Sequence, residues 1–119
     1  MNEIPHAPLI IAAAVVAIVV MFRLRRQKNQ KRVLATIQAG AKVIDVRSPD
    51  EFSKGHYQGA INIPVDRLAG KLKSVGSTDT SVVVYCASGA RSAAAERTLR
   101  SAGYKNVVNA GSFSTMPKA

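Results

Sequence analysis

The feature that most constrains the fold is an uncharged apolar block, LIIAAAVVAIVVMF, which occupies residues 9–22 of the 119-residue chain. In a helix, its apolar side chains would lie on every side, whereas a helix on the surface of a globular domain is apolar along one stripe only. The domain that follows, residues 33–119, is too small to cover such a helix on all faces. The block therefore predicts a transmembrane helix over residues 9–22, preceded by a short tail, residues 1–8.

The uninterrupted block is short, because a membrane span needs about 17–25 apolar residues. A helix that begins near Ile4 reaches the required length, and Pro5 and Pro8 would then lie near its start, where proline is tolerated. The competing interpretation is a secretory signal peptide, which carries its positive charges before the apolar region. Here the only charges before the block are Glu3 and the amino group, and the cluster of positive charges follows the block. This order favours a retained anchor.

A basic segment, residues 23–32, follows the apolar block and carries much of the net charge of +10. By the positive-inside rule, it predicts a single-pass protein with its soluble domain in the cytoplasm. The segment either extends the helix toward anionic lipid head groups or forms a solvated linker. Aromatic residues do not interleave with the charges, so we expect a membrane partner and no nucleic acid. The basic residues are Arg23, Arg25, Arg26, Lys28, Lys31 and Arg32.

The soluble domain alternates short apolar runs with helical segments. This alternation is typical of an α/β fold with a small central parallel sheet flanked by helices. Ser48, Pro49 and Glu51 form a capping-box sequence at a helix start, and Ser92 is the expected cap of the last helix. Strands are expected over residues 42–46, 60–63, 81–85 and 106–109, and helices over residues 33–38, 66–73 and 92–102, with another starting at Ser48.

The single cysteine, Cys86, follows the strongest strand signal, SVVVY. One cysteine excludes an intramolecular disulfide and a cysteine-based metal cluster. Ligand crevices of parallel sheets lie at the carboxyl ends of the strands, which is where Cys86 is placed. Glycine-containing loop backbone, a helix N-terminus and Arg91 all favour the thiolate, so the pKa of Cys86 is predicted to be lowered. The alternative is a buried structural cysteine.

Residues 86–92, CASGARS, resemble the active-site loop of single-domain rhodaneses. Two further stretches, VIDVRSPDEF at residues 43–52 and GHYQGAINIP at residues 55–64, are similar to the motifs that precede that loop in the same family. The resemblance implies a rhodanese-like domain over residues 33–119, with Cys86 as catalytic residue and persulfide carrier. It also implies a donor and anion site formed by Arg91, Ala87, Ser88, Gly89, Ala90 and Ser92.

The same resemblance implies a small-molecule sulfur donor, either thiosulfate or a low-molecular-weight persulfide, and a thiol or cyanide as acceptor. No cofactor and no metal are expected. Related phosphatases use a cysteine loop that is one residue longer, so the spacing from Cys86 to Arg91 disfavours phosphate chemistry. A non-catalytic, membrane-tethered binding or scaffold module of the same fold is the alternative function.

Other polar residues in these motifs have competing interpretations. Asp45 ends a strand at the same sheet edge as Cys86, and it either reaches the active site or binds loop backbone. Arg47 and Glu51 are four residues apart and are expected to pair with each other. His56 is expected to fix the turn after its helix. The family's closing G-G-x-x-x-W motif is absent, and Phe113 or Met116 is expected to cover the same apolar surface.

Overall fold

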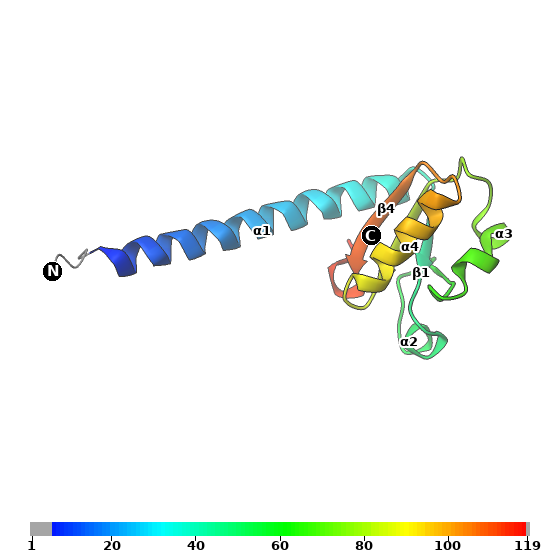
Figure 1. Ribbon diagram of the computed structural model, residues 1–119, viewed down its shortest axis with the longest axis horizontal. Coiled ribbons are helices and arrows are strands. Elements are labelled where there is room, and N and C mark those ends of the chain that lie inside the picture. Colours follow the sequence, from blue (N-terminus) through cyan, green and yellow to red (C-terminus); the bar gives the residue numbers. More distant parts are fainter. Residues whose placement is uncertain (1–5, 119) are drawn as a thin grey trace.

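The computed structural model describes residues 6–118, in which one long helix projects from a small α/β domain (Figure 1). The helix, α1 (Ala7–Gln38), includes both the apolar block and the whole basic segment, so the two are continuous with the domain. It is long and apolar enough to cross a membrane, and its apolar window is entirely exposed. The tail residues 1–5, including the expected start near Ile4, lie outside the described residues.

The domain contains a four-stranded parallel sheet in the order β2-β1-β3-β4, which confirms the predicted fold class. β3 (Val82–Cys86) is central and buried along its length, as expected for a run of valines in a parallel sheet. It pairs with β1 (Lys42–Asp45) on one side and β4 (Val107–Ser112) on the other, while β2 (Ile61–Asn62) pairs with β1 at the edge. β4 extends three residues beyond its predicted end.

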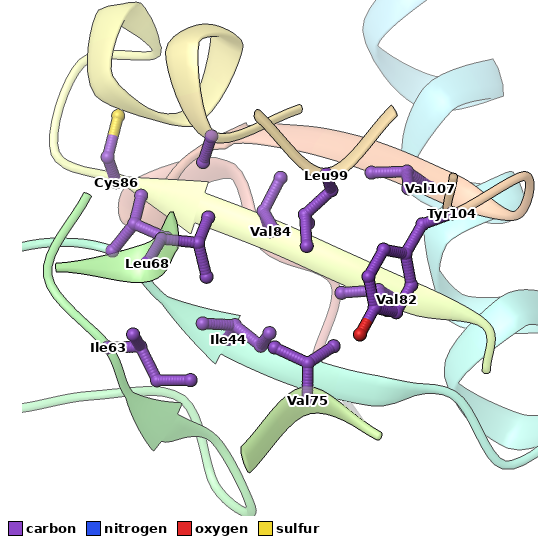
Figure 2. Packing of buried hydrophobic residues seen from close by; sticks show 12 residues of the cluster. Ile44, Ile63, Leu68, Val75, Val82, Val84, Cys86, Leu99, Tyr104 and Val107 are labelled. Atoms are coloured by element: carbon purple, nitrogen blue, oxygen red, sulfur yellow. The ribbon is translucent and has the colours of Figure 1, made fainter. Parts of the chain in front are cut away.

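Each face of the sheet has its own apolar core. One core lies under α4 (Ala90–Ser101) and includes Cys86 (Figure 2). The other core lies under α1 and contains Val33, Tyr85 and Met116, with Phe113 packed against it. Phe113 and Met116, either of which was expected to cover an apolar surface of the domain, both pack in this core. Neighbouring residues on β3 alternate between the two faces, so Cys86 and Tyr85 point in opposite directions.

Of the smaller helices, α2 starts where the sequence predicted, whereas the helix predicted over residues 66–73 is broken in two. α2 (Pro49–Ser53) begins with the predicted capping box, in which Ser48 and Glu51 satisfy each other's backbone N–H groups. The single helix expected over residues 66–73 is instead a 3-10 turn, η1 (Leu68–Gly70), followed by α3 (Leu72–Val75). Gly70 explains the break, because glycine is a poor helix former.

The end of α1 is part of the domain. Val33 is only 1% exposed and lies in the core, and the Gln30 side chain donates a hydrogen bond to the Thr115 carbonyl at 2.8 Å. Thr115 belongs to η2 (Phe113–Thr115), the 3-10 turn that follows β4. The helix expected over residues 33–38 is therefore the final part of α1. Its contacts fix the direction in which α1 leaves the domain.

Candidate active site

Cys86 is the last residue of β3, and a short loop leads from it into α4. Figure 2 shows its sulfur at the end of the strand, directed toward that loop. The sequence predicted the helix cap at Ser92, but the N-cap of α4 is Gly89, three residues earlier. Gly89 has φ +103°, a left-handed conformation that glycine adopts readily, and this turns the chain into the helix sooner. Arg91 and Ser92 consequently lie in the first turn of α4.

The loop directs hydrogen-bond donors at the Cys86 sulfur. The Gly89 N–H donates to Sγ at 2.9 Å. The Cys86 thiol donates to the Ser92 hydroxyl at 3.5 Å, and that hydroxyl donates to the Gly89 carbonyl at 2.9 Å. Once Cys86 is a thiolate, the Ser92 hydroxyl can rotate and donate to the sulfur. Burial alone would raise the pKa of Cys86, but hydrogen bonds from Ser92 and from the backbone N–H groups of Gly89 and Ser88 outweigh it and lower the pKa. The direction matches the sequence prediction. Such a thiolate is a good nucleophile at neutral pH.

Ser92→Ala is expected to raise the pH midpoint at which Cys86 reacts with iodoacetamide. The substitution removes the side-chain hydrogen bond that favours the thiolate, while the backbone donors remain. The measurement is the alkylation rate as a function of pH. Ser88→Ala is the matched control, because its hydroxyl is exposed and only its backbone N–H reaches the sulfur. An unchanged midpoint in Ser92→Ala would contradict the assigned role.

Arg91 makes a two-point salt bridge with Glu51 of α2. Its two terminal nitrogens lie 2.6 and 2.9 Å from the Glu51 carboxylate oxygens, and both side chains are about one-third exposed. The predicted pairing of Glu51 with Arg47 is therefore wrong. The sequence alone did not place Glu51 near the Cys86 loop. The available signal was its position at the start of a helix that follows a strand, at the same edge of the sheet as Cys86. A role for Arg91 in binding the sulfur donor stays a prediction.

The Glu51 pair predicts a specific acid sensitivity. Arg91 first, and then Ser48, lower the pKa of Glu51 from 4.5 to about 2. Because the folded-state pKa is depressed, the stabilisation is present above pH 4.5 and is lost as the pH falls toward 2. Glu51→Gln should flatten the pH dependence of Tm in this window. The effect should be modest, since solvent screens a partly exposed pair. An unchanged slope would contradict this pairing.

Asp45 does not contact Cys86, because its side chain lies on the opposite face of the sheet. It is fully buried, and its carboxylate accepts hydrogen bonds from the Arg47 backbone N–H at 2.9 Å and from the Arg47 guanidinium at 2.6 and 3.0 Å. This ion pair raises the pKa of Arg47. Arg47 also donates to the Gly55 carbonyl at 2.7 Å and lies over the Phe113 ring. The structural interpretation of Asp45 therefore accounts for its contacts.

His56 has the structural role expected for it. Its Nδ1 lies 2.9 Å from the Phe52 carbonyl oxygen, and its ring stacks on the Phe52 ring at 3.7 Å. A surface cavity of about 330 Å³ has Arg91, from the first turn of α4, on its wall together with Ser48 and Asp66, but residues 86–89 do not line it. Arg67, which sequence reasoning did not single out, is a second cation on this wall. Across residues 6–118, no three metal-ligating side chains gather as a metal site would require.

Fold and site together define an α/β protein whose one cysteine sits in an N–H-lined loop at the carboxyl edge of a parallel sheet. The sequence matches the family described as Rhodanese-like domain over residues 28–114. Thiosulfate sulfurtransferase PspE of Escherichia coli (strain K12) is 40% identical over 78 residues, which are 63% of this chain and 75% of PspE. An uncharacterized Bacillus subtilis (strain 168) protein, YqhL, is 34% identical over 107 residues, which are 83% of this chain and 84% of YqhL.

Solved structures agree with the sequence relatives. A rhodanese with anions from E. coli superimposes with a TM-score of 0.62 at 37% identity, covering 67% of this chain and 98% of that one. The human single-domain sulfurtransferase TSTD1 gives a TM-score of 0.64 at 29% identity, covering 71% and 88%. This chain belongs to the rhodanese-like domain family, as the resemblance of its motifs predicted.

Proposed function

We propose that this protein is a membrane-anchored sulfurtransferase that carries sulfane sulfur on Cys86. The observation that carries the proposal is the set of donors around Sγ, above all the Gly89 N–H at 2.9 Å. A buried thiolate needs such donors, and a structural cysteine does not. The sulfurtransferases among its relatives support the same chemistry.

The proposed reaction has two balanced steps. The Cys86 thiolate attacks the outer sulfur of thiosulfate, the S–S bond of the donor breaks, and sulfite leaves with the bonding electron pair. An acceptor thiolate or cyanide then attacks the outer sulfur of the Cys86 persulfide, and Cys86 leaves as a thiolate. Neither leaving group needs a proton, so the loop can work without a general acid. The N–H donors stabilise negative charge on either sulfur.

The loop must open for the donor to reach the sulfur, because Cys86 is fully buried. Its residues Ala87, Ser88 and Gly89 are small, which permits such a movement. The same burial, together with the engagement of Arg91 by Glu51, is the observation that favours the alternative function, a non-catalytic binding module.

Turnover distinguishes the two functions. The full-length protein in detergent micelles is supplied with thiosulfate or glutathione persulfide as donor, and cyanide or a small thiol as acceptor. We expect product with at least one donor. Absence of product with both donors would contradict sulfur transfer and favour the binding module. Phosphate release from p-nitrophenyl phosphate that requires Cys86 would instead revive the phosphatase interpretation.

We also propose that the domain lies on the cytoplasmic side of the membrane, and this location predicts a labelling pattern. In Cys86→Ser/Lys105→Cys, the only cysteine lies on an exposed part of the domain. We expect a membrane-impermeant thiol reagent to label this variant only after spheroplasts are permeabilised, because the basic segment holds the domain in the cytoplasm. Labelling after permeabilisation shows that the new cysteine is reactive. Rapid labelling of intact spheroplasts would contradict the cytoplasmic location.

A further inference from the structure

Helix α1 runs antiparallel to the strands it covers. Near its end, Thr36 lines a surface depression together with Ser81 and Asn106, which immediately precede β3 and β4. Earlier in α1, Gln30 bonds to Thr115, which follows the carboxyl end of β4. Moving backward along α1 therefore leads from the amino ends of the strands to their carboxyl ends and then out of the domain.

The catalytic loop lies at the edge from which α1 leaves. Cys86 pairs with Ser112, the last residue of β4, at the carboxyl edge of the sheet. In Figure 1, the yellow start of α4 lies on the side of the domain nearer the N-terminal part of α1. The sheet edge that carries Cys86 is thus directed back toward the apolar block rather than away from it.

The distance between the apolar block and the part of α1 that is docked on the domain is short and fixed. From Phe22, the last residue of the apolar block, to Gln30, the helix advances about 12 Å at a rise of about 1.5 Å per residue. The helix is unbroken over this stretch, and the burial of Val33 holds its end in the domain core. Lipid head groups occupy about 5–7 Å of that distance on each side of a bilayer. The remaining space fits a peptide segment but not a folded domain.

We propose that the active-site edge faces the bilayer and that the sulfur acceptor is a cysteine thiol in the juxtamembrane segment of a membrane protein. This inference rests on the proposed function, both for the anchor and for the Cys86 persulfide. The acceptor thiolate attacks the outer persulfide sulfur, the Cys86 S–S bond breaks, and the acceptor becomes a persulfide while Cys86 returns to a thiolate. Sulfur moves without net oxidation or reduction.

Confinement to the bilayer favours a membrane-bound thiol over a soluble one. Ala87, Ser88, Gly89 and Ala90 are uncharged, and Arg91 is already paired with Glu51. A thiol confined to the same bilayer is concentrated near the loop.

Proteoliposomes that contain the full chain, loaded with radioactive sulfur on Cys86, test the acceptor class. Three acceptor peptides are compared: a membrane-spanning peptide with one cysteine beside its apolar segment, the same peptide with that cysteine about 20 residues away on a Gly/Ser linker, and a soluble peptide with the same cysteine. We expect the juxtamembrane cysteine to receive sulfur at least about tenfold faster than either alternative. Equal rates for the three acceptors would overturn the proposal.

A matched variant separates orientation from simple tethering. A flexible Gly/Ser insertion of about 20 residues between Gln27 and Lys28 keeps the anchor and the docked end of α1 but frees the orientation of the domain. The preference for the juxtamembrane cysteine should disappear in this variant. A preference that persists would overturn the fixed orientation. Failure of Cys86 to load would contradict the proposed function, whereas loading without preference would contradict this inference alone.

An optical measurement tests the orientation without sulfur chemistry. In Cys86→Ser, a new cysteine at Ser88 marks the carboxyl edge and one at Lys105 marks the opposite end of the domain, and both positions are exposed. Each variant carries a donor fluorophore in vesicles whose surface contains acceptor-labelled lipid. We expect stronger energy transfer from position 88 than from position 105. Equal transfer, or stronger transfer from position 105, would overturn the proposal.

Discussion

Cys86→Ser is expected to reduce the rate of thiocyanate formation from thiosulfate and cyanide by at least about a thousandfold, because a serine hydroxyl is not ionised at neutral pH and cannot carry sulfane sulfur. Cys86 is the only cysteine in the chain, so no second thiol can replace it. The measurement is kcat/KM for the full-length protein in detergent.

Ser88→Ala is the control for this substitution. Ser88 lies two residues from Cys86 in the same loop, but its hydroxyl is exposed, and only its backbone N–H contributes to the site. The control should keep most of the activity. If Cys86→Ser keeps more than about a tenth of the wild-type rate, the assignment of Cys86 as the sulfur carrier is wrong.

Arg47→Met is expected to lower the free energy of unfolding by about 3–5 kcal/mol, since it leaves the Asp45 carboxylate buried without its partner. Asp45 is fully buried, and Arg47 donates hydrogen bonds both to its carboxylate and to the Gly55 carbonyl. The measurement is urea-induced unfolding of the full-length protein in one detergent at constant pH.

Glu96→Gln provides the comparison for the buried pair. Glu96 and Arg100 form a more exposed i,i+4 pair on α4 at 3.2 Å, and such pairs contribute about 0.3–0.5 kcal/mol. The double variant Asp45→Asn/Arg47→Met should lose less free energy of unfolding than the two single variants lose together, because each substitution removes the partner of the other residue. A loss below about 1 kcal/mol for Arg47→Met would contradict the importance of the buried pair.

Local patterns predicted much of the fold. The run SVVVY required a buried strand, and the capping box at Ser48 and Glu51 placed the start of α2 correctly. These features depend on residues close together in the sequence, so their physical causes can be recognised without a structure. The parallel arrangement followed from the alternation of strands with helices.

The errors concern choices that depend on three-dimensional context. Glu51 had two possible arginine partners, and the partner it takes, Arg91, is 40 residues away in sequence on another helix. Arg47 turns instead to the buried Asp45, which alternation along β1 places on the face opposite Cys86. The start of α4 depended on the positive φ of Gly89, which sequence alone does not fix.

The continuity of α1 was one of two open interpretations, because the basic segment contains no helix breaker but carries six positively charged side chains in ten residues. The structure shows that docking of Gln30 and Val33 joins the segment to the domain. This tertiary contact turns a possible linker into a rigid connection. It also determines the direction of the active-site edge, which no local pattern contains.

Intact-protein mass spectrometry after incubation with thiosulfate shows whether Cys86 carries sulfur as a persulfide. Glutathione persulfide serves as the second donor. We expect a gain of about 32 Da, one sulfur atom, that dithiothreitol reverses and that Cys86→Ser lacks. No gain with either donor, or an equal gain in Cys86→Ser, would show that Cys86 does not carry the sulfur.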